Sequence, residues 1–391
     1  MADWRVQVKR ILSALFILGT AVALFASLAA SQPPGAPKGR TMELTIVATG
    51  KDEAPVQDLK QDDITIKDDN RKQEIVSFEK IASGAPAAPG KLAIHNLVLI
   101  DSLNTPFSDA PENRLAMLKV LNELTKADNV TILVLRQDLK VVSEASQGAD
   151  SMLARFAKQG FDSSKADAFD WVFTDENVLG RLFTPVLVTG RARMEAWLHY
   201  SQIVASNMQT RAGRRNLYWI SQYFPPLIFG ETGAGYIEQV AGTDNRTDSA
   251  AQVSGTKRGT PTSDTARNEE AQLLSSYAKD IQNTARMLQN ANVAIYPLDA
   301  RYLCRNSATV ADKARMLDMA KSTGGLSFPS PKDLAAALHD AIQDTQTVYV
   351  ARYAMADSLF NGKDHSLKVE TRRKDVKLRM RNGYFPPQQS R

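Results

Sequence analysis

Residues 93–101 read Ala-Ile-His-Asn-Leu-Val-Leu-Ile-Asp, and residues 102–105 continue Ser-Leu-Asn-Thr. The nearly continuous apolar run predicts a central parallel strand that is buried on both faces. Asp101 stands where this strand ends, and ligands of open α/β sheets bind at the carboxyl ends of the strands. The stretch therefore indicates both a fold class and the edge of the sheet at which a binding site is expected.

Apolar strands and amphipathic helices alternate along the sequence on both sides of this stretch. Further strands are predicted at residues 130–135, 139–144, 216–221 and 293–298. Helices are predicted from their apolar spacing at residues 111–126, 194–208, 270–289, 313–320 and 331–342. The alternation predicts an α/β fold over residues 91–344, with a doubly wound, mostly parallel, Rossmann-like sheet.

Two groups of shorter strands flank this region. Residues 41–82 contain strand-like runs separated by acidic turns, and residues 345–386 alternate apolar with polar residues around an Asn361-Gly362 turn. Because the two groups lie on either side of the α/β region, we predict that they pair into one sandwich-like β unit. Residues 230–268 contain few large apolar side chains and are predicted to be a mobile insertion.

The N-terminus has the composition of an export segment. Three basic residues within the first ten precede an uncharged run, residues 11–30, that ends in small side chains. Residues 1–30 therefore predict a secretory signal, or an uncleaved anchor, because about 20 apolar residues suffice to span a bilayer. Either alternative places the chain outside the cytoplasm, in the periplasm or secreted, or held at the inner membrane. Residues 31–40, rich in proline and glycine, predict a linker.

Composition argues against several classes of protein. The net charge is +5, and it falls to +3 without residues 1–30, which hold three basic and one acidic side chain. This charge is too small to favour nucleic acid as a partner. A single cysteine, Cys304, excludes an intramolecular disulfide framework.

Scattered acidic residues and histidines offer little for a metal site elsewhere. The aspartates of the first strand group lack the spacing of a calcium loop, so they predict solvated turns. These aspartates are Asp58, Asp62, Asp63, Asp68 and Asp69. The four histidines, His95, His199, His339 and His365, are far apart in the sequence, and His365 is predicted to lie in a turn.

Several motifs occur in an order typical of a known family. Asp101-Ser102-Leu103-Asn104-Thr105 follows the central strand, Tyr296-Pro297-Leu298-Asp299-Ala300-Arg301 ends a later one, and Gly383-Tyr384-Phe385 lies near the C-terminus. Phe78 closes a strand-like run in the first group. Together they resemble the bacterial VWFA-related proteins of the Acidobacteria type, which contain a von Willebrand factor A domain. The resemblance implies an exported protein that binds a protein or peptide partner.

The resemblance also implies a divalent cation. In the von Willebrand factor A domain, an Asp-x-Ser-x-Ser motif coordinates an ion such as Mg²⁺. Asp101 and Thr105 match the aspartate and the second serine, and Thr189 or Thr184 would supply a threonine ligand. In the other interpretation, Asp101 and Thr105 cap the loop and the helix that follows it.

Two ligand positions of the expected cation site are altered in the sequence. Leu103 stands in place of the first serine, and Gln222 stands where the family has a second carboxylate. An apolar side chain cannot ligate Mg²⁺, and a neutral amide attracts it less than a carboxylate does. We therefore expect a degraded Mg²⁺ site and binding without a cofactor, with cation-dependent adhesion as the alternative.

The partner-binding surface is expected at the loops that follow the strands. The residues predicted there are Asp101, Ser102, Asn104, Thr105, Gln222, Tyr223, Phe224 and Asp299. Two alternatives remain open at this stage. The aromatic pair after the third strand is either exposed to a partner or packed in the core. Asp299 either faces a ligand or pairs locally with Arg301.

An extracytoplasmic hydrolase is the rival function. It would need a nucleophile, a base and an oxyanion site within reach of one another. The sequence contains no nucleophile elbow, phosphate-binding glycine loop or zinc-protease motif, so we expect no enzyme activity. A histidine beside Ser102, Ser221 or Cys304 would favour the hydrolase instead.

Overall fold

The computed structural model describes residues 40–84, 91–104, 111–124, 130–135, 139–143, 190–225, 227, 272–304 and 308–386. The predicted export segment and the predicted insertion at 230–268 lie outside these residues. Thr41–Arg391 form one compact unit. None of the helices described in this unit is long and apolar enough to cross a membrane.

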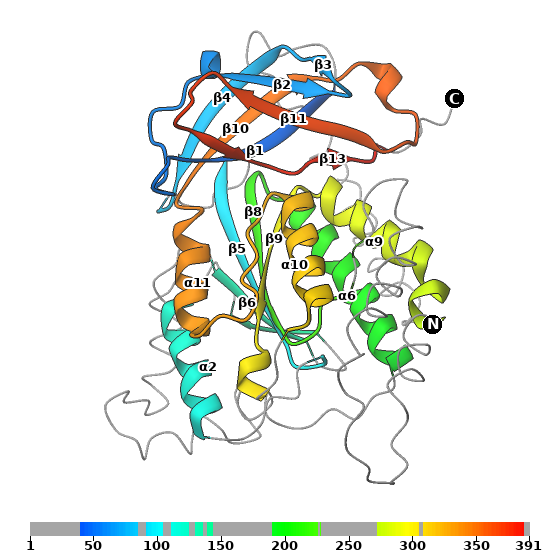
Figure 1. The fold of residues 1–391 in the computed structure, drawn as a ribbon. Coiled ribbons are helices and arrows are strands. Elements are labelled where there is room, and N and C mark those ends of the chain that lie inside the picture. Colours follow the sequence, from blue (N-terminus) through cyan, green and yellow to red (C-terminus); the bar gives the residue numbers. More distant parts are fainter. Residues whose placement is uncertain are drawn as a thin grey trace, which may run out of the picture. The chain divides into compact units, whose positions relative to one another are not determined.

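A five-stranded sheet forms the centre of the α/β region (Figure 1), with the strand order β7-β6-β5-β8-β9. Its strands are β5 (Ala93–Asp101), β6 (Val130–Leu135), β7 (Leu139–Ser143), β8 (Gly213–Ser221) and β9 (Val293–Asp299). β6, β5, β8 and β9 pair in parallel, while β7 is antiparallel to β6. These pairings confirm the predicted α/β class with a mostly parallel sheet.

Alternate residues of the parallel strands pack against different helices, because successive side chains of a strand point to opposite faces. In β5, Val98 and Ile100 lie in a core cluster with α2 and α11, whereas Leu97 and Leu99 lie in a cluster with α6, α9 and α10. These helices are α2 (Pro111–Leu124), α6 (Gly190–Gln209), α9 (Ala278–Asn290), α10 (Val310–Thr323) and α11 (Leu334–Gln343). Burial on both faces explains the continuous apolar runs in the sequence.

Several predicted boundaries differ from the structure, and three of them have a bearing on the fold. α11 begins at Leu334 rather than Pro331, because the Asp333 side chain accepts the backbone N–H groups of Ala335 (2.9 Å) and Ala336 (3.3 Å) and so caps the helix. The predicted helix 270–289 is interrupted at Tyr277, since residues 272–276 are helical and α9 follows from Ala278 to Asn290. β8 begins at Gly213, three residues before the predicted strand, and takes in two arginines that are buried.

Two four-stranded antiparallel sheets form the β unit, with the orders β12-β1-β10-β4 and β13-β11-β2-β3. The strands from the first segment are β1 (Thr41–Thr49), β2 (Ile64–Asp68), β3 (Arg71–Lys72) and β4 (Ile75–Ala82). Those from the last segment are β10 (Thr347–Ala354), β11 (His365–Thr371), β12 (Lys377–Arg379) and β13 (Gly383–Tyr384). The two segments lie in the same sheets, since β10 pairs with both β1 and β4, and β11 pairs with β2. The described residues also include the short 3₁₀ helices η1 (Gln61–Asp63), η6 (Arg301–Cys304) and η7 (Asp357–Leu359).

β1 packs with a different core on each of its faces. Leu44 and Ile46 lie in the core between the two antiparallel sheets. Val47 points the other way and shares a small cluster with Ile94, the second residue of β5. The β unit is therefore packed on the amino-terminal ends of the parallel strands.

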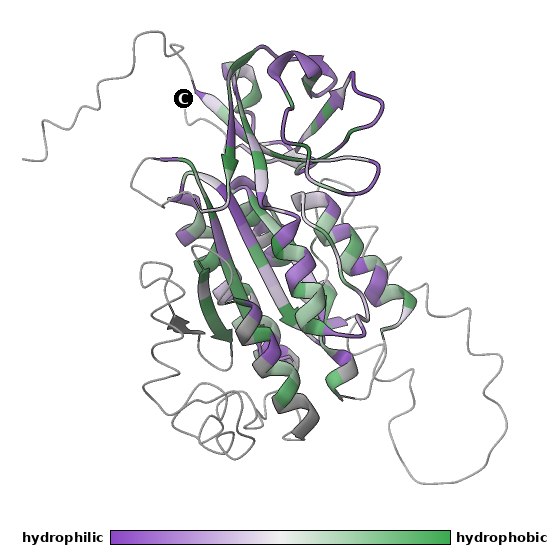
Figure 2. Cartoon of the chain, turned by 90° about the vertical axis from the view of Figure 1, so that its left-hand side faces the viewer, coloured by the Kyte–Doolittle hydropathy of each residue, from purple (hydrophilic) through white to green (hydrophobic). Residues whose placement is uncertain are grey.

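Arg214 of β8 joins the two regions through a buried polar network. Its side chain, 1% exposed, donates to Asn216 Oδ1 (2.8 Å), Thr45 Oγ1 (3.1 Å), the Tyr296 hydroxyl (2.8 Å) and Gly324 O (2.9 Å). Burial raises the pKa of Tyr296 to about 12, so its hydroxyl stays protonated. Figure 2 shows hydrophilic stretches within the central strands, in keeping with this network.

Glu43 of β1 adds charged contacts to the same junction. Its carboxylate accepts the Gly213 backbone N–H (3.3 Å) and lies 3.8 Å from Arg215 and 2.7 Å from Arg352. Arg381, also buried, donates to the Glu43 carbonyl at 3.1 Å. With the amino-terminal ends of the strands closed in this way, the carboxyl ends are the edge left for binding.

Candidate functional site

Asp101, Ser221 and Asp299 end three adjacent strands, β5, β8 and β9. Ile100 is in register with Ile220, and Ser221 with Asp299, so Ser221 lies between the two aspartates. All three side chains are buried. The structure thus brings the predicted Asp101 and Asp299 to one edge and adds Ser221 between them.

Hydrogen-bond donors from the protein surround the Asp101 carboxylate. Oδ1 accepts the Asn104 backbone N–H at 3.0 Å. Oδ2 accepts the Asn104 side-chain amide (2.9 Å), the Trp219 indole N–H (3.2 Å) and the Ser221 hydroxyl (3.0 Å). One donor contacts Oδ1 and three contact Oδ2, and the single Ser221 proton also lies within reach of the Tyr223 carbonyl at 2.8 Å.

Burial raises the pKa of Asp101, although the hydrogen bonds from Asn104, Trp219 and Ser221 act in the opposite direction. Desolvation disfavours the charged form of a carboxyl group, and here it outweighs the donors that favour that form. The folded protein therefore disfavours the ionised form of Asp101, even though hydrogen-bond donors surround its side chain.

Asp299 forms the local ion pair that was one of its two predicted alternatives. Oδ1 accepts the Arg301 backbone N–H (3.0 Å) and lies 3.3 Å from Arg301 Nε. Oδ2 accepts the Ser330 backbone N–H at 3.2 Å. The Arg301 side chain continues to the Gln222 carbonyl (2.7 Å) and to Asp312, which links the ends of β8 and β9.

The other predicted partner-binding residues differ in exposure. Ser102 and Asn104 are buried, at 5% and 8% exposed, whereas Gln222 and Tyr223 are half-buried. Phe224 is 1% exposed and packs edge-on against the Trp219 ring at 5.4 Å. The interpretation of Phe224 as an exposed aromatic was therefore wrong, because its ring completes the core beneath the edge.

A divalent cation does not fit the described part of the expected Mg²⁺ site. Leu103 is 4% exposed and belongs to the core cluster that includes α6 and α9, so the altered motif position has a packing role. Both Asp101 oxygens lie within hydrogen-bond distance of N–H or O–H donors of the protein. The other predicted ligands, Thr105 and Thr189 or its alternative Thr184, lie outside the described residues.

Sequence reasoning predicted Arg301 as a partner of Asp299 but missed Trp219, Ser221 and Ser330 as donors to the two aspartates. Trp219 and Ser221 alternate with Tyr218 and Ile220 along β8, so they share the face on which Asp101 ends β5. The alternation of side chains along β8 could therefore have indicated that Trp219 and Ser221 lie on the same face of the sheet as Asp101. Ser330 carried no such signal, since it reaches Asp299 from a loop far along the sequence.

The four histidines make contacts away from this edge. His95 lies 3.2 Å from the Ala212 carbonyl, and its pKa is lowered by burial and then by the charge of Arg211. His199 packs on the Tyr200 ring. His339 pairs with Glu123 at 3.2 Å, and His365 pairs with Asp69 at 2.7 Å. Among the described side chains, no hydrogen bond or ion pair joins a histidine to Ser102 or Ser221.

One other place in the described residues brings metal-ligating side chains together. Asp68, Asp69 and His365 offer ligand atoms that all lie within 4.8 Å of one another. They belong to the β unit, and we return to them below.

Comparison with known proteins finds little similarity. No protein-family profile and no curated protein matches the chain. A solved structure with a weak similarity is that of the PilB minor pilin from Streptococcus sanguinis. The match has 10% sequence identity and a TM-score of 0.28, and it covers 65% of this chain and 61% of the pilin chain.

Proposed function

We propose that the chain is an extracytoplasmic interaction protein. In this proposal, a von Willebrand factor A-like domain binds a protein or peptide partner at the carboxyl edge of its parallel sheet, without a cation. The observation that carries the proposal is that protein donors contact both oxygens of Asp101 and of Asp299 at that edge. Carboxylates whose oxygens are bound by protein donors suit a structural role at a surface better than chemistry on a ligand.

The location of the surface follows from the junction with the β unit. Ligands of open α/β sheets bind outside the carboxyl ends of the strands. At the opposite ends, Glu43 and Thr45 of β1 contact Gly213 and Arg214. The partner surface is therefore proposed around Gln222 and Tyr223, which are half-buried beyond the end of β8.

A protein or peptide suits this edge better than other ligands. Tyrosine is enriched at protein interfaces because its ring packs while its hydroxyl stays hydrated. The small net charge of +5 gives no basis for nucleic acid. A membrane is proposed to contribute only through residues 1–30, if that segment is retained as an anchor.

A photo-crosslinker placed at Tyr223 tests this proposal in the native envelope. We expect Tyr223→benzoyl-phenylalanine to give a discrete adduct with a protein, in equal yield with and without EDTA, because no cation takes part. A matched probe at Val76, which is 40% exposed on β4, should give no such adduct. The proposal fails if both positions give the same products, or if EDTA abolishes the Tyr223 adduct.

A further inference from the structure

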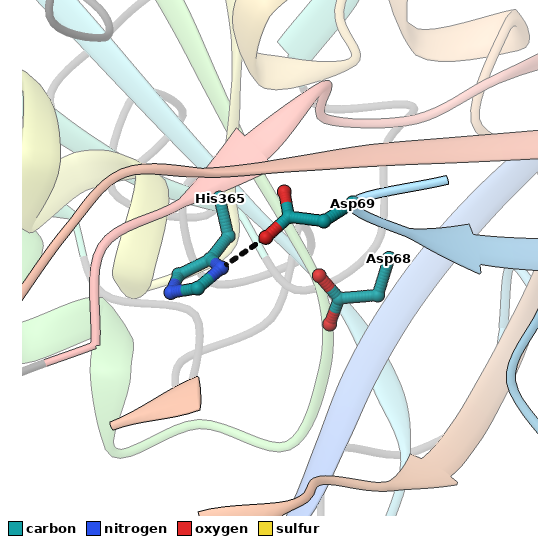
Figure 3. Close-up of side chains that lie close together, drawn as sticks. All are labelled: Asp68, Asp69 and His365. Carbon is teal, nitrogen blue, oxygen red and sulfur yellow. Dashed lines mark hydrogen bonds and ion pairs between the residues drawn. The ribbon is translucent and has the colours of Figure 1, made fainter. Parts of the chain in front are cut away.

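Asp68, Asp69 and His365 of the β unit lie close together, as Figure 3 shows. Asp68 ends β2, Asp69 begins the turn to β3, and His365 begins β11. Pairing of β2 with β11 brings the turn and the histidine together, and the Asp69 N–H donates to the Ser366 carbonyl at 3.0 Å. The prediction of solvated turns was wrong for Asp68, which is 1% exposed.

Asp68 has one oxygen that is fully engaged and one that is not. Oδ2 accepts the hydroxyls of Tyr353 (2.7 Å) and Tyr384 (2.8 Å). Burial, together with the nearby Asp68 carboxylate, raises the pKa of both tyrosines, so they remain donors. Oδ1 is buried and has no hydrogen-bond partner among the described residues. A buried carboxylate oxygen without a partner is costly, so this atom calls for a donor or a cation.

His365 has its proton fixed on one side of the ring. Nε2 lies 3.1 Å from Asn361 Oδ1, which also accepts the Lys363 backbone N–H at 2.9 Å and must therefore be the amide oxygen. Nε2 is then the donor to Asn361. The other nitrogen, Nδ1, faces Asp69 Oδ2 at 2.7 Å. A bare nitrogen and a carboxylate oxygen repel each other, so a positive charge has to lie between them, either a proton or a metal ion.

The Asp69 carboxylate is placed to bind this proton or metal ion. The Ser366 backbone N–H (2.9 Å) and hydroxyl (3.3 Å) donate to Asp69 Oδ1, while Oδ2 is directed at His365 Nδ1. The Asp69 side chain is 44% exposed, which gives the cluster access to solvent. An ion could therefore enter at Asp69 and reach the buried oxygen of Asp68.

We propose that Asp68, Asp69 and His365 form a binding site for a divalent transition metal of the Zn²⁺ type. Ligands around tetrahedral Zn²⁺ lie about 2.0–2.2 Å from the ion, hence about 3.4 Å apart. The three ligand atoms, within 4.8 Å of one another, need only small movements to reach that arrangement. A bound ion would displace the proton on Nδ1, which is released to solvent.

The metal accounts for the cluster more completely than a proton does. A proton on Nδ1 satisfies His365 and Asp69 but leaves Asp68 Oδ1 without a partner. Metal-ligating histidines commonly donate their second N–H to an oxygen, as His365 does to Asn361. Mg²⁺ and Ca²⁺ prefer all-oxygen ligands, so the imidazole selects a transition metal. The His365 ring also stacks on Tyr384 at 5.1 Å, so the ion would tie the β2 turn to β11 and β13.

Calorimetric titration of the metal-free, tag-free full chain with ZnCl₂ tests the site. We expect one Zn²⁺ per chain, and an affinity that falls at least about 100-fold in Asp69→Asn and His365→Gln, since each loses a ligand. The control is His339→Gln, which breaks the His339–Glu123 pair and should leave Zn²⁺ binding unchanged.

Three outcomes would overturn the proposal. They are the absence of saturable Zn²⁺ binding, equal affinity in the two ligand variants and the wild type, and tighter binding of CaCl₂ than of ZnCl₂. The first would leave the proton as the occupant of the pair. Because the Asp69 side chain is partly exposed, Asp69→Asn is expected to fold even if His365→Gln does not, and circular dichroism checks this for each variant.

Discussion

Replacing Arg214 by alanine is expected to lower the free energy of unfolding by about 3–5 kcal/mol. The substitution removes four hydrogen bonds and leaves the Asn216, Tyr296 and Gly324 oxygens buried without their donor. It also opens a cavity at a fully buried side chain. Guanidinium unfolding followed by tryptophan fluorescence measures the loss, since Trp197 and Trp219 are both in the core.

Two further variants separate the causes of this loss. Arg214→Met fills most of the space but provides no donor, so its stability should lie between those of the wild type and the alanine variant. Arg191→Ala, at a side chain 76% exposed in a surface pair with Glu195, should leave the stability close to that of the wild type. A loss below about 1 kcal/mol in Arg214→Ala would show that the polar network does not hold the junction together.

Asp101→Ala is expected to lower the free energy of unfolding by about 2–4 kcal/mol, because each buried donor left unpaired costs about 1–3 kcal/mol. The orphaned donors belong to Asn104, Trp219 and Ser221. Asp101→Asn keeps an acceptor oxygen and should lose less, about 1–2 kcal/mol at pH 7. Chemical unfolding of the two variants measures both losses.

The pH dependence of Asp101→Asn provides a separate test. Because burial raises the pKa of Asp101 above its unfolded value, the folded state binds the proton more tightly. The resulting stabilisation is present below the unfolded pKa and is lost as the pH rises through the folded pKa. The asparagine variant lacks this loss, so it should gain stability relative to the wild type as the pH rises from the unfolded pKa of an aspartate through the folded pKa. A constant difference would contradict the raised pKa, and Asp340→Asn, at an exposed position on α11, serves as the control.

Local patterns in the sequence predicted the strands that are buried on both faces. The run ending at Asp101 becomes β5, since a nearly continuous apolar run is typical of a central parallel strand that is buried on both faces. The start of β8 could not be predicted in the same way. Arg214 and Arg215 resemble solvated residues until Thr45, Tyr296 and Ala291, distant in the sequence, supply their acceptors.

The candidate edge was predictable only in part. The positions of Asp101 and Asp299 at the ends of predicted strands placed both residues at this edge. The neighbouring Arg301 indicated the local ion pair with Asp299. Whether the aromatic pair was buried depended on Trp219, against which Phe224 packs, and the sequence left that open. His365 and Asp69 are 296 positions apart, so their pairing depends on how the two terminal segments meet.

The central claim is that the carboxyl edge of the sheet works without a divalent cation, because the Asp101 oxygens are occupied by internal donors. Calorimetric titration of Mg²⁺ into the full chain and into Asp101→Asn tests this claim most directly. We predict no micromolar Mg²⁺ binding that depends on Asp101, with the same heats in both proteins. Saturable micromolar binding to the wild type that disappears in Asp101→Asn would contradict the claim and restore a cation to the edge.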